Sequence, residues 1–286
     1  MASERPGISH QSEGKVALSE IDLEVAGHLV HAWQGGAGFP ILMLHGSGPG
    51  AGTIGNWRLV LEPLAARYRI LAADLIGFGQ SARKKTEPYF DPALWLAEAE
   101  GLLQHLPAGP VGIIGHSVSG ALALKLAARN PDRVVKVLTT GSMGNRFKPN
   151  RYTEECWNFP ETKEALRSAV GNLVYDQSVI TEEFLDNRIK ILHGGDYAPY
   201  FRAMFAGDKQ RYIDAAAVSD DELKRIKADV LMLHGRDDKP FPCADNTLVL
   251  APKIARADAM VIAACGHSPA LEHPQKLIAA AHLLFG

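Results

Sequence analysis

The 286-residue chain has little cysteine and no excess of charge of either sign. Its three cysteines, Cys156, Cys243 and Cys265, are far apart and form no CxxC pair, which gives no disulfide framework and fits a reducing compartment. Lys and Arg number 30 against 32 Asp and Glu, a formal net charge of -2. The sequence therefore offers no broad basic surface for nucleic acid or an anionic membrane, and we expect a small-molecule partner.

Long apolar runs are also missing. No run approaches the ~18–20 residues of a membrane helix, and the polar start MASERPGISHQSEGK lacks the apolar centre of a signal peptide. These absences predict a cytoplasmic protein. With 47% hydrophobic and 22% charged residues, the chain can bury a large core and is typical of one globular domain with an insertion.

Two apolar patterns predict the secondary structure. Residues 15–27 and 28–33 alternate apolar and polar side chains, as the two strands of a hairpin do. Short apolar runs bounded by Gly, Asp or His then predict buried parallel strands at Ile41–Leu44, Ile70–Ala73, Val111–Ile114, Val134–Leu138, Val230–Leu233 and Met260–Ala264. Apolar spacings of three and four predict helices at Trp57–Tyr68, Pro92–Leu106, Val118–Asn130 and His273–Phe285.

The alternation of strands and helices predicts an α/β fold with a mostly parallel, doubly wound sheet and helices on both faces. It stops between residues 145 and 228, where the chain is richer in charge, Tyr and Phe and has no buried-strand runs. We therefore expect a core formed by residues 1–144 and 229–286, with residues 145–228 inserted as a helical cap.

A serine stands between a predicted strand and a predicted helix, in the motif GHSVSG at residues 115–120. This is the context of a nucleophile elbow, a sharp turn that exposes a serine at the end of a strand. The strained backbone at such a serine requires small neighbours, and Gly115, Ser119 and Gly120 supply them. The motif differs by one residue from GxSxG, and a pattern this loose also occurs by chance.

A nucleophilic hydroxyl needs a base, and the base needs an acid to orient it. Candidates for both follow later strands, in HGRDD at residues 234–238 and in CGH at residues 265–267. Each lies at the carboxyl end of a parallel strand, where open α/β sheets bind their ligands. The sequence therefore predicts a triad of Ser117, Asp238 and His267, with Asp237 as the alternative acid.

The loop HGSGPG at residues 45–50 follows the first parallel strand. We expect the backbone N–H groups of Ser47 and Val118 to form an oxyanion hole beside Ser117. The same loop imitates a dinucleotide fingerprint, GxGxxA with Asp74 after the next strand. Pro49 argues against that interpretation, because it removes an N–H from the phosphate-binding turn.

From residue 29 to 285 the chain resembles the α/β-hydrolases, and more narrowly the meta-cleavage-product hydrolases. Those enzymes split a carbon–carbon bond in ring-opened products of aromatic degradation. The resemblance rests on HGSGPGAGTIGNWR (45–58), DLIGFGQSAR (74–83), VYDQSVITEEFLDNRI (174–189), HGRDD and CGH. The stretch 174–189 counts most, because caps vary widely within this fold.

The resemblance implies roles for several residues. It supports the same triad and oxyanion hole, and it favours Asp238, at the fourth position of a Gly-x-x-Asp turn, over Asp237. It also makes Asn56 and Arg188 substrate-binding candidates, since a guanidinium binds a carboxylate through two parallel hydrogen bonds. Alternatively, Asn56 caps a helix that begins at Trp57, and Arg188 is a charge on a surface helix.

Two residues depart from the family pattern. His116 replaces the usual Asn before the nucleophile, and Ser268 replaces the usual Trp after the catalytic histidine. Both family residues touch the dienoate, so His116 and Ser268 are candidates for substrate binding. His116 fits equally well as a buried histidine whose hydrogen bonds are satisfied within the protein.

The implied reaction is hydrolysis of a 2-hydroxy-6-oxo-dienoate, without a metal or organic cofactor. Three alternatives stay open: a carboxylesterase, lactonase or thioesterase with the same triad, a cofactor-independent dioxygenase, and a non-catalytic receptor on the same fold. The family resemblance also implies a homodimer or larger homo-oligomer.

Overall fold

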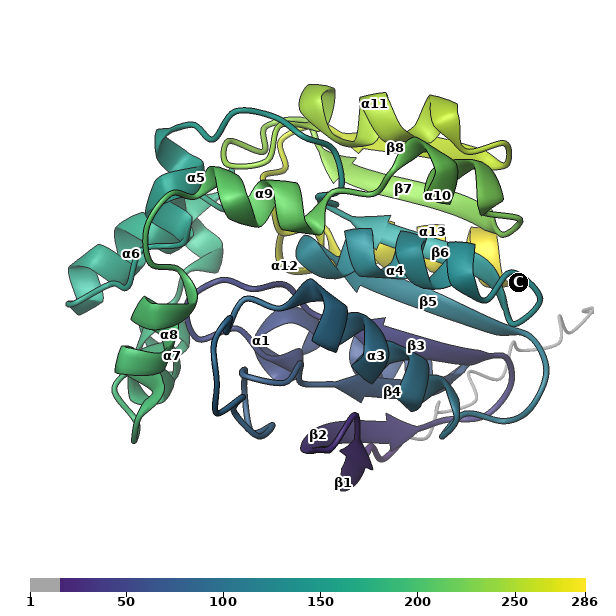
Figure 1. The fold of residues 1–286 in the computed structure, drawn as a ribbon, viewed down its shortest axis with the longest axis horizontal. Helices are drawn as coiled ribbons and strands as arrows, with labels where there is room; N and C mark the ends of the chain where they lie inside the picture. The colour runs from purple at the N-terminus through teal and green to yellow at the C-terminus, as the bar shows by residue number, and fades with distance from the viewer. Residues whose placement is uncertain (1–15) are drawn as a thin grey trace, which may run out of the picture.

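An eight-stranded sheet forms the centre of the molecule in the computed structural model, which describes residues 16–286 (Figure 1). The N-terminal stretch considered above, including Lys15, lies outside the described residues. The strands are β1 (Ser19–Val25), β2 (His28–Gly35), β3 (Pro40–Leu44), β4 (Arg69–Ala73), β5 (Val111–His116), β6 (Val134–Thr140), β7 (Asp229–Gly235) and β8 (Ala257–Ile262). Their order in the sheet is β1-β2-β4-β3-β5-β6-β7-β8.

The strands from β3 to β8 are parallel, and β1 and β2 are antiparallel additions at one edge. β1 and β2 form the predicted hairpin, turning at Ala26 and Gly27, which both have positive φ. The predicted α/β-hydrolase fold class is therefore confirmed at the level of sheet and layers. β8 begins three residues before the predicted run at Met260. The apolar pattern missed these residues because they are partly exposed at the edge of the sheet.

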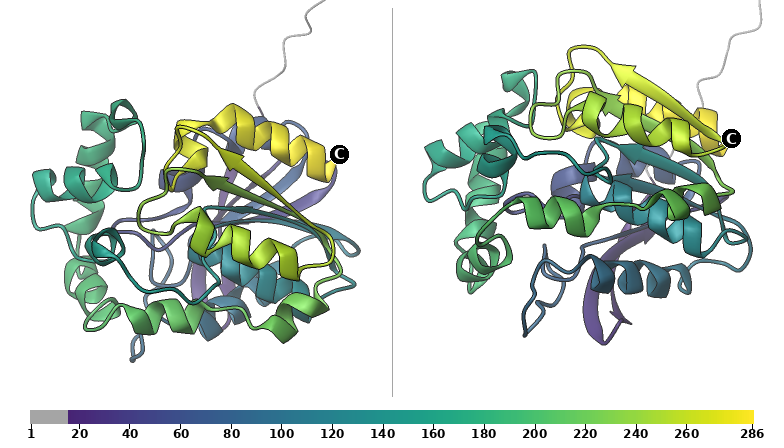
Figure 2. Two further views of the ribbon diagram at one scale, coloured as in Figure 1. Left: turned by 90° about the horizontal axis from the view of Figure 1, so that it is seen from above. Right: turned by 45° about the horizontal axis from the view of Figure 1, so that its top comes forward.

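Helices cover both faces of the sheet. Figures 1 and 2 show α3 (Pro92–Leu103), α4 (Val118–Arg129) and α10 (Asp220–Arg225) on one face and α13 (Pro274–Phe285) on the other. Alternate residues of β3 divide between the two cores, with Leu42 and Leu44 in one and Ile41 and Met43 in the other. A parallel strand covered on both faces is apolar throughout, which is why the buried runs were readable in the sequence.

The predicted helix over residues 57–68 is wrong in its extent. The structure has two short helices instead, α1 (Thr53–Trp57) and α2 (Leu61–Ala65). Pro63 explains the break, because it has no N–H for the carbonyl of Leu59 and its ring clashes there. α1 begins before Asn56, so the alternative role of Asn56 as the cap of a helix starting at Trp57 is wrong as well.

The segment between β6 and β7 is helical, as expected. It contains α5 (Arg151–Cys156), α6 (Lys163–Gly171), η1 (Gln177–Val179), α7 (Glu182–Leu192), α8 (Tyr197–Met204), α9 (Gln210–Ala216) and α10. We call α5 to α9 the cap helices; α5 to α8 gather at one end of the sheet (Figure 1). α10 packs against α4 instead. The division of the chain at residues 144 and 228 stays a prediction.

Short elements complete the second part of the core. They are η2 (Cys243–Asp245), α11 (Thr247–Leu250), η3 (Ala251–Lys253) and α12 (Pro269–Glu272). Among residues 16–286, no helix combines the length and hydropathy that crossing a membrane requires.

Candidate active site

Ser117 occupies the turn between β5 and α4. Its backbone has φ 58° and ψ -121°, a region that residues with a Cβ rarely adopt. The turn is possible because its neighbours are small: a Cβ on Gly115 would lie 2.2 Å from the Ser119 carbonyl oxygen, and one on Gly120 would lie 2.3 Å from Ser142 Oγ. The local geometry is therefore that of a nucleophile elbow.

His267 and Asp238 meet beside this turn. Nδ1 of His267 lies 2.7 Å from Oδ2 of Asp238, and both side chains are buried. Burial alone would raise the pKa of Asp238, but the charge on His267 and a hydrogen bond from His234 outweigh it and hold that pKa below its usual range. No hydrogen bond or ion pair joins Asp237 to His267 in the described part of the chain; the carboxylate of Asp237 lies 3.7 Å from Nε of Arg236.

Because Nδ1 of His267 is bound to Asp238, its Nε2 is available to accept a proton from a group in the cavity. No hydrogen bond joins Ser117 Oγ to His267 among the described residues, although both side chains line one cavity. Catalytic hydrogen bonds of this kind are often long until substrate is bound. The arrangement can deprotonate a hydroxyl at Ser117 and return the proton to a leaving group.

The loop that carries Ser47 lies directly against the elbow. A Cβ on Gly46 would come within 3.0 Å of the side chains of both His116 and Ser117. His45 fixes the loop, because its Nδ1 donates to the Gly46 carbonyl (2.6 Å) and its Nε2 accepts from the N–H of Leu75 (2.9 Å).

The two N–H groups predicted for the oxyanion hole are placed near Ser117. Val118 is the first residue of α4, so its N–H has no partner within the helix. The N–H of Ser47 likewise makes no backbone hydrogen bond among the described residues. The positive end of the α4 dipole would add to the attraction for an oxyanion.

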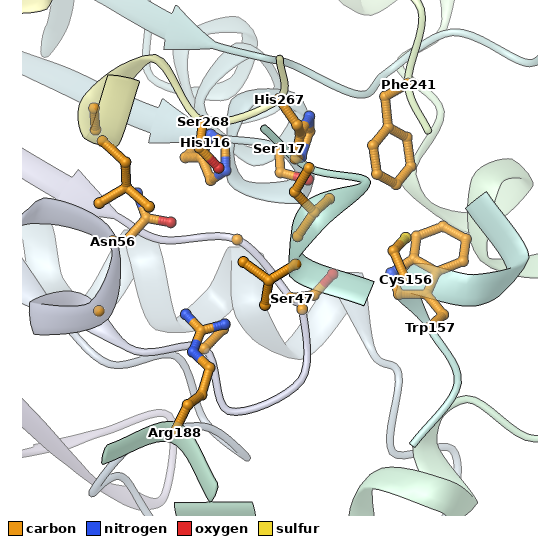
Figure 3. Close-up of a pocket in the computed structure, with 18 of the residues that line it drawn as sticks. Ser47, Asn56, His116, Ser117, Cys156, Trp157, Arg188, Phe241, His267 and Ser268 are labelled. Atoms are coloured by element: carbon orange, nitrogen blue, oxygen red, sulfur yellow. The ribbon is translucent and has the colours of Figure 1, made fainter. Parts of the chain in front are cut away.

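A cavity of about 60 Å³ opens over Ser117. In Figure 3, Asn56 lies to one side of Ser117, Arg188 enters from α7, and Trp157, Cys156 and Phe241 form the opposite wall. The cavity is therefore polar on one side and aromatic on the other. It is lined by Gly46, Ser47, Gly48, Ala51, Gly55, Asn56, His116, Ser117, Cys156, Trp157, Val170, Leu173, Phe184, Arg188, Phe241, His267, Ser268, Ala270 and Leu271.

Arg188 extends from α7 toward the core instead of into solvent. Its Nη1 donates to the Pro49 carbonyl at 2.8 Å, and its guanidinium lies 5.1 Å from the ring centre of Phe184. Burial lowers the pKa of Arg188 to about 10, and the charge of Arg58 contributes to the lowering. Among residues 16–286, no carboxylate forms an ion pair with it. At neutral pH it is thus a half-buried cation that makes no ion pair with a carboxylate of the described residues.

His116 and Ser268 both reach the cavity. Nδ1 of His116 lies 2.9 Å from the Thr140 carbonyl oxygen, which only accepts, so Nδ1 carries a proton. Burial, and after it the charge of His267, lower the pKa of His116 well below its usual value. The ring is therefore neutral, and its Nε2 is an acceptor. Ser268 caps α12 through its backbone, which receives the N–H groups of Leu271 and Glu272.

The alternative dinucleotide interpretation does not agree with the structure. The carboxylate of Asp74, which would have bound a ribose, instead accepts the N–H groups of Thr53 (2.6 Å) and Gln80 (2.9 Å). Within residues 16–286, no group of three or more His, Cys, Asp or Glu side chains is placed to hold a metal ion.

Sequence reasoning missed the aromatic wall and the contacts behind Asp238. Trp157 follows α5 at a position that no periodic pattern marks, and Phe241 lies in an irregular loop. His234 is the first residue of the motif HGRDD, but the sequence pattern assigned it no role beyond its place at the end of a predicted strand. Its proximity to Asp238 in the sequence was the one signal that could have linked it to the site.

Comparisons with known proteins agree with this geometry. A family profile described as alpha/beta hydrolase family matches residues 41–281. A 2-hydroxymuconate semialdehyde hydrolase of Pseudomonas sp. strain CF600 is 33% identical, over 89% of this chain and 90% of that protein. A 2-hydroxy-6-oxo-2,4-heptadienoate hydrolase of Pseudomonas putida F1 is 32% identical, over 85% and 87%.

Solved structures give the same result. The meta-cleavage product hydrolase of Pseudomonas fluorescens IP01 superimposes with a TM-score of 0.87 at 30% identity, over 91% of this chain and 95% of that chain. The 2-hydroxy-6-oxo-6-phenylhexa-2,4-dienoate hydrolase of Rhodococcus sp. strain RHA1 has a TM-score of 0.85 at 27% identity, over 94% and 98%. The chain therefore belongs to the α/β-hydrolase family and, within it, to the meta-cleavage product hydrolases.

Proposed function

We propose that the protein hydrolyses the carbon–carbon bond between C5 and C6 of a 2-hydroxy-6-oxo-dienoate. The observation that carries this proposal is Arg188, which lines the cavity and makes no ion pair with any carboxylate of residues 16–286. A buried charge is costly unless it is paired, so the site favours a ligand that brings a carboxylate. Asn56, on the same side of the cavity, would add a hydrogen bond to this group.

The chemistry follows from the positions of the side chains. The dienol first becomes the 2-oxo form, which lets the carbon chain accept the electrons of the breaking bond. His267 takes the proton of Ser117, and Oγ attacks the 6-oxo carbon, whose oxyanion receives the N–H groups of Ser47 and Val118. C5 is protonated when the dienol becomes the 2-oxo form. When the C5–C6 bond breaks, its electron pair moves along the chain to the 2-oxo oxygen, which takes the proton held by His267 and leaves a hydroxydienoate. Water then releases the acyl group from Ser117 as a carboxylic acid.

The aromatic wall favours a small acyl group at C6. Trp157, Phe241 and Cys156 are each 2% exposed and close this side of the cavity over Ser117. Two relatives, at 33% and 32% identity, are named for an aldehyde and for a methyl ketone, both with a small substituent on this carbon. We therefore propose a substrate that carries hydrogen or a short alkyl group there.

Ester or lactone hydrolysis is the second candidate. It is favoured by His116 and Ser268, which line the cavity where the family resemblance predicts Asn and Trp. Neither residue supplies the side-chain amide or indole N–H of the usual pair, so binding of a dienoate depends more on Arg188. A dioxygenase would differ from both candidates by consuming oxygen during turnover.

The test is a comparison of two substrates in wild type and in Arg188→Met. Losing one partner of a buried charge pair costs about 2–5 kcal/mol, so kcat/KM for a short-chain dienoate should fall roughly 30-fold to several-thousand-fold. A neutral aryl acetate should change by about 1 kcal/mol or less. If Arg188→Met leaves both substrates equally reactive, the carboxylate site is wrong and the esterase becomes the better assignment.

A further inference from the structure

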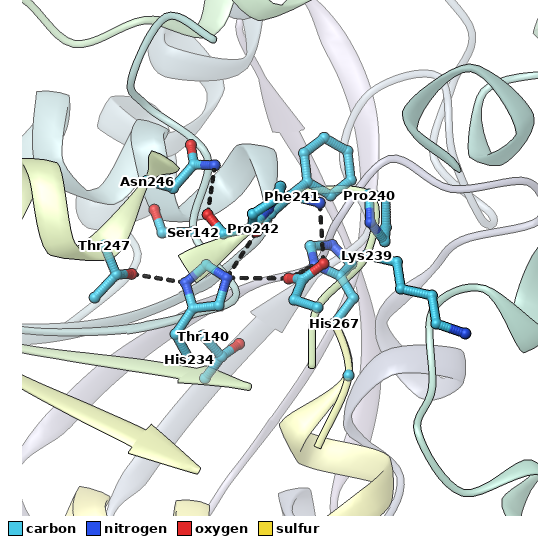
Figure 4. Close-up of polar contacts among 12 residues, drawn as sticks. Thr140, Ser142, His234, Lys239, Pro240, Phe241, Pro242, Asn246, Thr247 and His267 are labelled. Carbon is cyan, nitrogen blue, oxygen red and sulfur yellow. Dashed lines mark hydrogen bonds and ion pairs between the residues drawn. The ribbon is translucent and has the colours of Figure 1, made fainter. Parts of the chain in front are cut away.

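Asp238 contacts a second buried histidine besides His267. Figure 4 shows His234, the penultimate residue of β7, with one side of its ring toward Thr247 and the other toward His267. Its Nε2 lies 3.0 Å from Oδ2 of Asp238 and 2.9 Å from the Phe241 carbonyl oxygen. Its Nδ1 lies 2.7 Å from Oγ1 of Thr247.

These contacts determine which nitrogen of His234 carries the proton. Both atoms near Nε2 are acceptors, a carboxylate oxygen and a carbonyl oxygen, so Nε2 must donate. On the other side, the hydroxyl of Thr247 can donate to Nδ1. The ring is fully buried and held at both edges, so its orientation is fixed.

The donor from His234 reaches the same oxygen that His267 uses. Oδ2 of Asp238 accepts from both rings, at 2.7 Å from His267 and 3.0 Å from His234, while Oδ1 accepts the N–H of Phe241 at 3.0 Å. Each donated bond stabilises the carboxylate and lowers its affinity for a proton. Two donors on one oxygen also restrict rotation of the carboxylate.

We propose that His234 is a positioning residue for the triad. Its Nε2–H holds Oδ2 of Asp238 toward His267 and withdraws negative charge from that oxygen, so that less negative charge faces the ring of His267. This inference rests on the proposed role of Ser117, Asp238 and His267. His234 itself is outside the set of residues that line the cavity, so it acts through Asp238 and not on substrate.

Few other titratable groups surround His234. Cys243 and Asp245 lie on η2, and Cys265 precedes His267 in the adjoining loop. Burial raises the pKa of Cys243 to about 11 and that of Cys265 further, so both thiols are neutral across the pH range of interest. Asp245 is exposed. A change in pH profile at position 234 therefore reports on Asp238 and His267.

The test measures how fast an alkyl fluorophosphonate phosphonylates the intact protein between pH 5 and 9. This probe needs only the serine and its base, so the readout does not depend on the identity of the natural substrate. Mass spectrometry identifies the labelled residue. The variants are His234→Met, which keeps the volume without a donor, and His234→Gln, which restores an N–H. His105→Met, an exposed histidine away from the cavity, is the matched control.

In wild type we expect labelling at Ser117. The labelling rate should rise with pH on the acidic side of the profile, which we call the acid limb, and then reach a plateau. His234→Met should move this limb upward by roughly half to one pH unit, because a less stabilised carboxylate holds the proton on His267 more strongly. The plateau rate should also fall about tenfold. His234→Gln should bring the limb back toward the wild-type position, and His105→Met should follow wild type.

Other outcomes contradict the inference. If His234→Met and His234→Gln both have their acid limb at the same pH as wild type, the ring of His234 only fills space. If wild type is not labelled at Ser117, the proposed triad fails and the inference fails with it. Should His234→Met not fold, nitrogen-15 NMR of the wild-type histidines decides: a proton on Nε2 of His234 supports the proposal, and a neutral ring protonated at Nδ1 overturns it.

Discussion

At the scale of single residues, Ser117 combines a strained backbone with a reactive position. Its φ of 58° is held by contacts that larger neighbours would break, at Gly115 and Gly120. Strain of this kind costs on the order of 1–3 kcal/mol and persists only where the surroundings enforce it. The turn places Ser117 in the lining of the cavity and leaves the N–H of Val118, the first residue of α4, without a partner in the helix.

Ser117→Ala should fold normally and lose at least ~10³-fold in turnover. The methyl group tolerates the same backbone as serine, but without Oγ the remaining rate comes only from binding and the oxyanion hole. Steady-state kinetics with a short-chain dienoate, together with thermal unfolding, checks both halves of the prediction. Near-normal turnover in the folded variant would remove Ser117 from the mechanism.

Trp157 sets the size of the acyl group in the proposal. Replacing it by Leu should open the aromatic wall and raise kcat/KM for a 6-phenyl dienoate relative to a 6-methyl dienoate by tenfold or more. Phe205→Leu is the matched control, because Phe205 stacks on Trp157 at 5.6 Å but does not line the cavity. An unchanged ratio in Trp157→Leu would show that another part of the cavity limits the acyl group.

At the scale of elements, strands were more predictable than helices. The runs in β3 to β7 were evident because both faces of each strand are buried. The helix predicted over residues 57–68 was wrong in its extent because apolar spacing continues across the break between α1 and α2. Spacing alone does not reveal the backbone hydrogen bond that Pro63 cannot donate.

Site residues followed the same rule. Ser117, Asp238 and His267 could be chosen as triad candidates because each follows a readable strand, and their catalytic roles stay predictions. Trp157 could not, since its wall is assembled from cap and loop segments far apart in the sequence. The cytoplasmic location and the homo-oligomeric state stay predictions.

Helix α3 carries a buried acid that links stability to pH. Glu98 is completely buried, and its Oε2 accepts the N–H of Ile76 at 3.0 Å. Burial, and to a smaller degree the charge of Asp74, raise the pKa of Glu98 to about 8. The folded protein therefore keeps this carboxyl protonated over a range in which the unfolded chain ionises it.

The sign of the effect follows from proton uptake. Between pH 4.5 and about 8 the folded state binds the extra proton, so the free energy of unfolding should fall as pH rises through this window. The loss at pH 8.5 should be a few kcal/mol at most. Glu98→Gln keeps the acceptor for Ile76 without a charge, so urea unfolding at pH 5.5 and 8.5 should show a smaller decline. Equal declines in both proteins would contradict the assignment.

At the scale of the whole molecule, the cap is joined to the loop that carries His267. The N–H of His267 donates to the Leu173 carbonyl oxygen at 2.8 Å. On α12, Glu272 accepts the N–H groups of Tyr175 (2.7 Å) and Asp176 (3.0 Å) with Oε1 and the N–H of Gly266 (2.7 Å) with Oε2. One carboxylate thus connects three backbone donors across the cap and the core.

Removing this carboxylate should affect catalysis more than folding. Glu272 is only partly buried, so Glu272→Ala should lower the free energy of unfolding by about 1–2 kcal/mol, the scale of lost charge-assisted hydrogen bonds. The loop of His267 would become less fixed relative to Ser117, and a small misplacement of a catalytic group can cost up to ~10²-fold in rate.

Glu164→Ala, on the exposed side of α6, is the matched control. The measurement pairs kcat with amide hydrogen exchange across residues 173–176 and 266–267. Faster exchange there with a reduced kcat is the expected result, whereas faster exchange with an unchanged kcat would mean that the His267 loop holds its position without the cap.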